Sequence, residues 1–242
     1  MSDFIPIITI DGPSGSGKGT VAAWLAARLG WHYLDSGALY RVLGLWAIRR
    51  QVSLDDEQAL VALGEVLPVD FRADRVWLDG DDVGDLIRTE TAGEQASRVA
   101  AHAQVRTALL DRQRQFARPP GLVTDGRDMG SVVFPKAALK LFLTASPEER
   151  ACRRYKQLKE KGMDVSLIDL SAEIRARDER DRNRPVAPLV APAAAFEVES
   201  THLGIDEVLD RVWERTLQVF PNLVNNPPGG PATGQTFHQP PF

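Results

Sequence analysis

Residues 5–20 read Ile-Pro-Ile-Ile-Thr-Ile-Asp-Gly-Pro-Ser-Gly-Ser-Gly-Lys-Gly-Thr, and they predict the first structural elements of the chain. Ile5–Ile10 is almost entirely apolar, which is typical of a strand buried on both faces of a parallel sheet. From Lys18 onward, apolar residues recur every four positions between Val21 and Leu29, and Gly30 is suited to end a helix. The sequence therefore predicts a strand, a glycine-rich loop and a helix in direct succession.

The glycine-rich loop lies where a phosphate-binding loop would lie. Its glycines let polyphosphate approach main-chain N–H groups that β-carbons would obstruct, and the start of the helix adds further N–H donors. Lys18 supplies a compact positive charge for a transferred phosphoryl group. Gly19 follows the lysine, so the first hydroxyl after it comes only at Thr20. The candidate phosphate-binding residues are Gly12, Pro13, Ser14, Gly15, Ser16, Gly17, Lys18, Gly19 and Thr20.

A glycine-rich turn without a ligand is the alternative interpretation of this loop. Its six fixed residues recur by chance only on the order of once in ten million start positions. Because they also stand between a predicted strand and a predicted helix, the phosphate-binding interpretation is favoured.

The rest of the chain alternates between short apolar runs and helical patterns. Such alternation predicts a parallel α/β sheet. A serine is expected to cap the helix that starts near Ser36, and Ser146, Pro147 and Glu149 predict another helix start with a capping box. The further strand candidates are Tyr33–Leu34, Leu122–Thr124, Leu139–Leu143 and Ala195–Val198.

One segment and the end of the chain break this alternation. Residues 69–72 and 75–78 alternate around Ala73-Asp74, and a second turn follows at Asp79–Asp81, which predicts a small antiparallel insert over roughly 63–91. A helix is expected from about Ile205 to Phe220. Residues 222–242 contain five prolines, three glycines and no charged side chain, so we expect a flexible tail there.

The composition excludes several classes of protein. The chain has 242 residues, 43% of them hydrophobic, which is enough for a buried core. With 29 basic and 33 acidic side chains, the net charge of -4 argues against general binding of nucleic acid. Cys152 is the one cysteine, which excludes an internal disulfide, and no signal segment or apolar run of membrane-spanning length stands out. We expect a soluble, cytoplasmic protein.

Two short motifs combine arginines with carboxylates. Asp35–Arg41 opens a predicted helix, and Asp125–Asp128 follows a predicted strand at its carboxyl end, where ligands of open α/β sheets collect. There, the guanidinium groups of Arg41 and Arg127 would each bind phosphate oxygens through two parallel hydrogen bonds. Arg41 alone could also be an ordinary exposed helix residue. Asp125 could organise a Mg²⁺ ion through water.

Positive charge is concentrated between residues 150 and 184, where eleven Lys or Arg stand against seven Asp or Glu. A solvated helix with ion pairs four residues apart explains most of these side chains. Arg177, Asp181 and Arg184 fall on one face of the helical pattern that ends at Pro185. With Arg153 and Arg154 on the preceding helix, they predict an arginine-bearing lid over a nucleotide.

Four segments together resemble the bacterial cytidylate kinases. They are Gly12–Thr20, Asp35–Arg41, Asp125–Gly130 and Arg180–Arg184. The resemblance runs from about Ile8 to Phe220, and the last three segments together are specific to that family. It implies a P-loop NTPase fold of the α/β class, in which helices flank a parallel sheet and a small antiparallel insert and a helical lid are added. The expected kinase domain covers 1–221, with its core at about 1–62 and 92–220, the acceptor-binding insert at 63–91 and the lid at about 153–184.

The resemblance also implies roles for single residues. Those expected at the phosphate of CMP or dCMP are Arg41, Arg127 and Arg184. Those expected around the cytosine are Ser36, Ser97, Arg106 and Asp128, and Tyr40 belongs to the same acceptor-binding group. Those expected at the sugar are Arg177 and Asp181. Arg153 and Arg154 are expected to bind the donor, and the catalytic candidates are Lys18, Arg127, Arg154 and Arg184. Uracil lacks the exocyclic amine from which Asp128 would accept a hydrogen bond.

The implied activity is transfer of a phosphoryl group from ATP, with Mg²⁺, to CMP or dCMP. We also expect a monomer that binds neither nucleic acid nor membranes. Another monophosphate or a small alcohol as acceptor stays open, because the phosphate loop does not specify the acceptor. A nucleotide-dependent switch is disfavoured by the absence of an Asn-Lys-x-Asp motif and of a hydroxyl at position 19. Binding of nucleic acid through 150–184 is disfavoured by the acidic residues among the basic ones.

Overall fold

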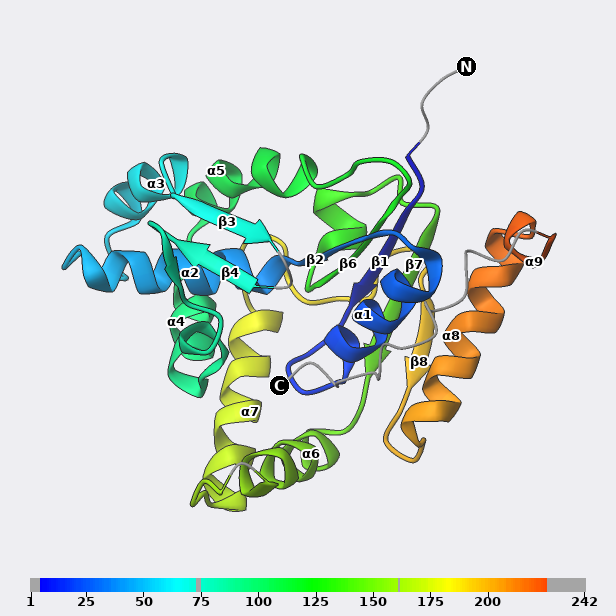
Figure 1. Ribbon diagram of the computed structural model, residues 1–242. Coiled ribbons are helices and arrows are strands. Elements are labelled where there is room, and N and C mark those ends of the chain that lie inside the picture. The colour runs from blue at the N-terminus through cyan, green and yellow to red at the C-terminus, as the bar shows by residue number, and fades with distance from the viewer. Residues whose placement is uncertain (1–4, 73–74, 161, 226–242) are drawn as a thin grey trace. The chain divides into compact units, whose positions relative to one another are not determined.

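The computed structural model describes residues 5–72, 75–160 and 162–225 (Figure 1). Its contacts divide the chain into two compact units. The first contains the chain up to Leu34, Phe116–Asn183 and the chain from Ala187 on, and the second contains Asp35–Gln115 and Arg184–Val186. These units do not coincide with the predicted core, insert and lid, and those predicted ranges stay predictions.

The first unit is built on a five-stranded sheet with the strand order β2-β6-β1-β7-β8. The strands are β1 (Ile7–Asp11), β2 (His32–Asp35), β6 (Leu122–Gly126), β7 (Leu139–Thr144) and β8 (Phe196–Glu199). The central strand β1 is parallel to both β6 and β7, and β7 is parallel to β8. Asp11 lies opposite Gly126 in this register, so β1 and β6 end side by side. The predicted α/β class with a parallel sheet is confirmed.

Helices α1 (Lys18–Leu29) and α8 (Ile205–Val219) pack against this sheet. Leu25 of α1 and Ile8 and Ile10 of β1 are completely buried in one apolar core, which explains why this part of the chain is so apolar. Gly30 adopts a left-handed conformation and donates its N–H to the carbonyls of Ala26 and Ala27, which confirms that it ends α1.

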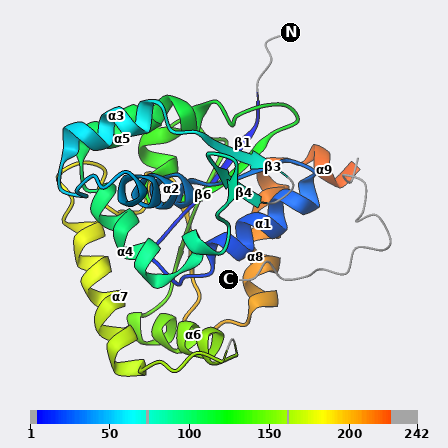
Figure 2. The same cartoon turned by 60° about the vertical axis from the view of Figure 1, so that its left-hand side comes forward.

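Helices α6 (Pro147–Glu160) and α7 (Leu167–Arg182) pack against each other in the same unit (Figures 1 and 2). Ser146 Oγ accepts the Glu149 N–H at 3.2 Å, so Ser146 caps α6 as predicted. The predicted capping box does not form, because the Ser146 N–H donates to the Thr201 hydroxyl and the Glu149 carboxylate accepts from Arg153. A π-helical turn over Met129–Val133 follows β6.

The second unit is mainly helical. Its elements are α2 (Ser36–Arg49), α3 (Glu57–Glu65), β3 (Val69–Arg72), β4 (Arg75–Leu78), β5 (Asp81–Asp82), a 3-10 turn (Leu86–Arg88), α4 (Glu90–Val99) and α5 (Ala103–Arg114). Helix α2 packs on α4, and α3 packs on α5. Strands β3, β4 and β5 form the predicted antiparallel sheet, whose first turn at Ala73-Asp74 lies outside the described residues.

The structure corrects three predictions about element ends. The cap of α2 is Asp35, whose carboxylate accepts the Ala38 N–H at 3.2 Å, because Ser36 is already inside the helix. Helix α7 ends at Arg182, so Arg184 lies beyond the helix and not on its predicted face. The expected tail begins with a short helix, α9 (Asn222–Asn225), and its remainder, 226–242, lies outside the described residues.

Among the described residues, no helix combines the length and the apolar character that crossing a membrane requires.

Candidate active site

The loop between β1 and α1 depends on glycines at its turns. A β-carbon on Gly12 would lie 2.0 Å from the Leu143 carbonyl oxygen, so only glycine fits there. Gly15 and Gly17 have φ angles of 75° and 88°, which other residues rarely adopt. Lys18 at the first position of α1 donates from Nζ to the Pro13 carbonyl at 3.2 Å, which holds the side chain across the loop.

Arg150 of α6 supports this loop through a hydrogen bond. Its guanidinium donates to the Ser14 carbonyl at 2.9 Å and to the Ala145 carbonyl at 2.9 Å. It also binds the carboxylate of Asp178 on α7. Arg150 is not among the predicted site residues, because nothing in the sequence pattern of α6 distinguishes a buried arginine from the exposed ones around it.

Two carboxylates lie at the adjoining strand ends. Asp125 of β6 accepts a hydrogen bond from the Tyr33 hydroxyl at 2.7 Å. Asp11 of β1 accepts the main-chain N–H groups of Met129 and Gly130, each at 2.8 Å. Burial raises the pKa of Asp11 to about 7, and the two N–H donors oppose this rise only in part.

The two carboxylates differ in their suitability for Mg²⁺. Mg²⁺ is commonly held by one or two carboxylates, substrate phosphates and water. Asp125 offers a hard oxygen donor at the end of its strand and fits a contact through water. Each oxygen of Asp11 is already engaged by a main-chain N–H, so Asp11 does not fit. The described residues contain no group of three or more His, Cys, Asp or Glu side chains arranged to hold a metal.

The structure brings together Arg127 and Asp181, two predicted acceptor-binding residues. Arg127 Nε donates to Asp181 Oδ2 at 2.8 Å, and the Asp181 side chain is only 5% exposed. Burial lowers the pKa of Arg127, but the charge and hydrogen bond of Asp181, together with the charges of Asp125 and Asp178, outweigh this effect and the net pKa is raised. Arg127 therefore stays charged, as a ligand for phosphate must.

The two predicted donor-binding arginines lie on α6 with different contacts. Arg153 donates to Glu149 at 2.9 Å, to the Ser200 hydroxyl at 3.2 Å and to the Ser200 carbonyl at 2.6 Å. Arg154 donates to Gln157 at 3.3 Å. The guanidinium of Arg153 thus links α6 to the residue after β8, and donor binding by either arginine stays a prediction.

Six predicted acceptor-binding residues belong to the second unit. Ser36, Tyr40 and Arg41 lie on α2, Ser97 on α4, Arg106 on α5, and Arg184 in the short segment beyond α7. Arg41 forms an ion pair with Asp35. The Arg106 guanidinium lies 5.6 Å from the centre of the Tyr40 ring, and Arg106 also donates to the Ala100 carbonyl at 3.3 Å.

Four of these six residues are almost completely buried polar side chains, namely Ser36, Ser97, Arg106 and Arg184. Burying such groups is costly unless they find partners. Ser97 Oγ is buried and has no hydrogen-bond partner among the described residues. A polar ligand would supply one.

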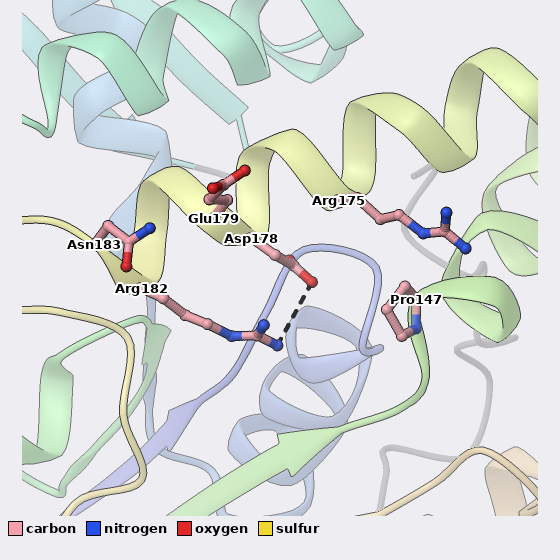
Figure 3. Close-up of a pocket in the computed structure, with 6 residues that line it drawn as sticks. All are labelled: Pro147, Arg175, Asp178, Glu179, Arg182 and Asn183. Carbon is pink, nitrogen blue, oxygen red and sulfur yellow. Dashed lines mark ion pairs between the residues drawn. The ribbon is translucent and has the colours of Figure 1, made fainter.

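A pocket of about 360 Å³ opens beside the C-terminal half of α7 (Figure 3). Its lining residues are Pro147, Arg175, Asp178, Glu179, Arg182 and Asn183. Arg182 reaches back towards Asp178, with Nη2 4.0 Å from Oδ2 (Figure 3). Two guanidinium groups and two carboxylates balance one another here, and none of the six residues is a predicted site residue.

Comparison with known proteins identifies the family. The family model described as cytidylate kinase matches residues 8–218. The chain belongs to the cytidylate kinase family. Cytidylate kinases of Aeromonas salmonicida and Pseudomonas fluorescens are 57% and 59% identical to it, each over 88% of this chain and over 94% and 95% of their own lengths. The cytidylate kinase of Methylococcus capsulatus is 58% identical over 86% of this chain and 96% of its own length.

Two solved structures are less similar in sequence to this member of the cytidylate kinase family than those relatives are. One from Thermus thermophilus has a TM-score of 0.44 at 24% identity and covers 89% of this chain and 98% of its own. A gluconokinase from Sinorhizobium meliloti has a TM-score of 0.47 at 15% identity and covers 92% of this chain and 97% of its own.

Proposed function

We propose that this protein transfers the γ-phosphoryl group of ATP to the phosphate of CMP or dCMP, which yields ADP and CDP or dCDP. The observation that carries the proposal is a complete phosphate loop with Lys18, in a chain 57–59% identical to cytidylate kinases over nearly their full length. An oxygen of the acceptor phosphate bonds to the γ-phosphorus as the bond to ADP breaks, and ADP leaves with the electron pair. No covalent enzyme intermediate is required.

The work of the protein is then to align two anions and to neutralise the charge that spreads over the transferred group. Lys18 and the main-chain N–H groups of the loop are proposed for the donor phosphates. Arg41, Arg127 and Arg184 are proposed for the acceptor phosphate. One arginine acting on the transferred group is typically worth 10³ to 10⁵ in rate, roughly 4 to 7 kcal/mol of barrier.

Recognition of the base is proposed for Ser36, Ser97, Arg106 and Asp128, and contact with the sugar for Arg177 and Asp181. The burial of Ser97 Oγ without a partner among the described residues supports a polar ligand near α4. Mg²⁺ is proposed as the cofactor, held by the phosphates and, through water, by Asp125. When bound, it would neutralise phosphate charge.

We further propose that the protein acts in the cytoplasm as a monomer and takes part in pyrimidine nucleotide metabolism. Its one cysteine, Cys152, fits a reducing compartment. Its near balance of acidic and basic side chains supports neither nucleic acid nor a membrane surface as a partner.

A panel of acceptors tests the proposal. CMP, dCMP, UMP, AMP, GMP and a sugar alcohol are each offered with ATP and Mg²⁺, and ADP formation is followed by a coupled assay. We expect CMP and dCMP to give the highest kcat/KM and the product to be the cytidine diphosphate. A clear preference for any other acceptor would contradict the proposal.

A further inference from the structure

Arg150 is a charged side chain that the proposed chemistry does not use. Its side chain is 1% exposed, the most deeply buried arginine among the described residues. Its Nε donates to the Ala145 carbonyl at 2.9 Å, and Nη1 donates both to the Ser14 carbonyl at 2.9 Å and to Asp178 Oδ1 at 3.0 Å. Its Nη2 donates to Asp178 Oδ2 at 2.5 Å. One planar group thus joins the loop, the segment after β7 and helix α7.

The charge of Arg150 is already neutralised inside the protein. Asp178 faces it with both oxygens and is 4% exposed, which is the strongest pairing geometry for a guanidinium. Because four of the five N–H groups are committed to protein acceptors, Arg150 is unsuited to bind a ligand phosphate itself. Its effect on a ligand has to pass through the groups that it holds.

One of those groups is the peptide between Ser14 and Gly15. A trans peptide points its carbonyl and its N–H in opposite directions. Since Arg150 binds the Ser14 carbonyl, the Gly15 N–H points away from Arg150. Phosphate loops bind through N–H groups that face the ligand, so this orientation is the one that phosphate binding requires, and the reversed peptide would present a carbonyl oxygen to an anion.

The conformation of Gly15 makes this orientation dependent on outside support. Glycine adopts a φ of 75° about as readily as a negative φ, so the backbone at Gly15 has little intrinsic preference for one peptide orientation. The backbone lies close to Arg150, because a β-carbon on Gly15 would be 3.2 Å from the Arg150 β-carbon. Contact and hydrogen bond together hold the peptide.

The other group is α7. Asp178 lies one helical turn before Asp181, which holds Arg127 at 2.8 Å. The guanidinium of Arg150 therefore ties the loop to the helix that carries two proposed acceptor-binding residues, Arg177 and Asp181.

We propose that Arg150 is a positioning residue for phosphoryl transfer, which keeps the Gly15 N–H directed towards the donor phosphates and fixes α7 to the loop through Asp178. The proposal rests on the proposed function, because it assumes that the donor phosphates bind at this loop.

The test separates positioning from stability. Arg150→Met alone leaves the buried Asp178 carboxylate with only the Arg182 guanidinium, 4.0 Å away, and should destabilise the protein strongly. In Arg150→Met/Asp178→Leu, apolar side chains replace both charges, and urea unfolding should show stability near that of the wild type. The Ser14 carbonyl stays unsupported in the double variant. Its kcat/KM for ATP should therefore fall roughly 10- to 100-fold. Its KM for CMP should rise by a smaller factor, because α7 stays packed on α6 but loses its tie to the loop.

A second variant and a control complete the design. Arg150→Lys keeps the charge beside Asp178, but its three N–H donors lie on one nitrogen and cannot replace those on Nε, Nη1 and Nη2, so it should show the same loss towards ATP. Arg175→Gln removes an exposed ion pair with Glu148 that bridges the same two helices, and its kinetics should equal those of the wild type. Normal kcat/KM for ATP in a folded double variant, or in Arg150→Lys, overturns the proposal. A wild-type protein that does not phosphorylate CMP contradicts the proposed function instead.

Discussion

Lys18 is the side chain on which the proposed chemistry depends most directly. Its Nζ spans the loop to the Pro13 carbonyl, a contact that places the ammonium group at the loop without burying it completely. Lys18→Ala should lower kcat about 100-fold or more, because the charge on the transferred group loses its counterion, while thermal unfolding stays close to that of the wild type. Lys136→Ala, at an exposed position, is the control. Near-normal turnover by Lys18→Ala would exclude the predicted role of the loop.

Asp128 is the residue proposed to select cytosine. It is 5% exposed and directly precedes the turn that Asp11 holds through the Met129 and Gly130 N–H groups. Asp128→Ala should lower kcat/KM for CMP roughly 10- to 100-fold, the range for a lost hydrogen bond to a charged group. UMP offers no amine to this carboxylate, so turnover of UMP should change far less. Equal losses for both acceptors would mean that Asp128 does not recognise the base.

Asp11 should make the stability of the protein depend on pH. Burial raises its pKa from 3.8 to about 7, and the charges of Asp128 and Asp125 add to the rise. Between about pH 4 and pH 7 the folded protein therefore binds more protons here than the unfolded chain, so the free energy of unfolding should decrease as the pH rises through this window. Above about pH 7 the contribution is constant.

Asp11→Asn removes this titration. Urea unfolding at several pH values should show a flatter dependence for Asp11→Asn than for the wild type between about pH 4 and pH 7. Asp164→Asn is the matched control, since Asp164 is exposed and its pKa is lowered by the side chain of Lys159. Parallel curves for Asp11→Asn and the wild type would assign the pH dependence to another group.

The residues of the candidate site were predictable to different degrees. The loop and the Asp-Gly-Arg-Asp motif stand out in the sequence because each needs unusual residues at fixed spacing. Arg150 and Asp11 do not stand out, because their roles come from partners far away in the chain. Arg150 binds a carbonyl 136 positions before it, and Asp11 binds N–H groups 118 and 119 positions after it. Local patterns contain no information about such pairs.

At the scale of elements, local signals predicted where most strands and helices lie but not always how they end. Ser146 and Pro147 fix the start of α6, because a cap and a proline act on their own neighbours. The sequence predicts a serine cap for α2, but Asp35 and Ser36 are both good capping residues and the sequence alone does not distinguish them. The helical pattern of the sequence continues to Pro185 and so predicts a longer α7, although the helix ends at Arg182.

The cap of α2 has a measurable consequence. Asp35 accepts the Ala38 N–H and also pairs with Arg41. Asp35→Ala should lower the free energy of unfolding by about 1 kcal/mol, the usual cost of a lost N-cap. Asp35→Asn keeps a capping oxygen and should lose only the small contribution of a partly exposed ion pair. Urea unfolding of the two variants checks this, and equal losses would assign the effect to the ion pair with Arg41.

At the scale of the whole molecule, the sequence predicted the α/β class but not the two compact units into which the chain divides. The antiparallel strands stand out in the sequence because apolar and polar residues alternate in them. The predicted insert, 63–91, extends only a few residues beyond these strands. In the structure their apolar residues Val76 and Leu78 share a core with Leu43 of α2 and Leu109 of α5. The unit therefore extends over Asp35–Gln115, and long-range packing of this kind has no signature in a local pattern.

The distribution of charge along the chain bears on which anions the molecule can bind. The segment 150–184 is rich in basic residues, yet Arg150, Arg175 and Lys159 are all paired with carboxylates. With a net charge of -4, the chain has no overall excess of positive charge. Anion binding should therefore be confined to local sites that fit small phosphorylated ligands, and long nucleic acids should find few contacts.

Titration with salt separates local from general anion binding. Raising KCl from about 50 mM to about 500 mM should increase KM for ATP and for CMP, because salt screens the charges of partly exposed arginines and lysines. An oligonucleotide of single-stranded DNA should neither inhibit turnover nor bind measurably at the lower salt concentration, since counterion release needs many phosphate contacts. Tight oligonucleotide binding that weakens steeply with salt would contradict this prediction, because it requires the broad positive surface that the paired arginines do not provide.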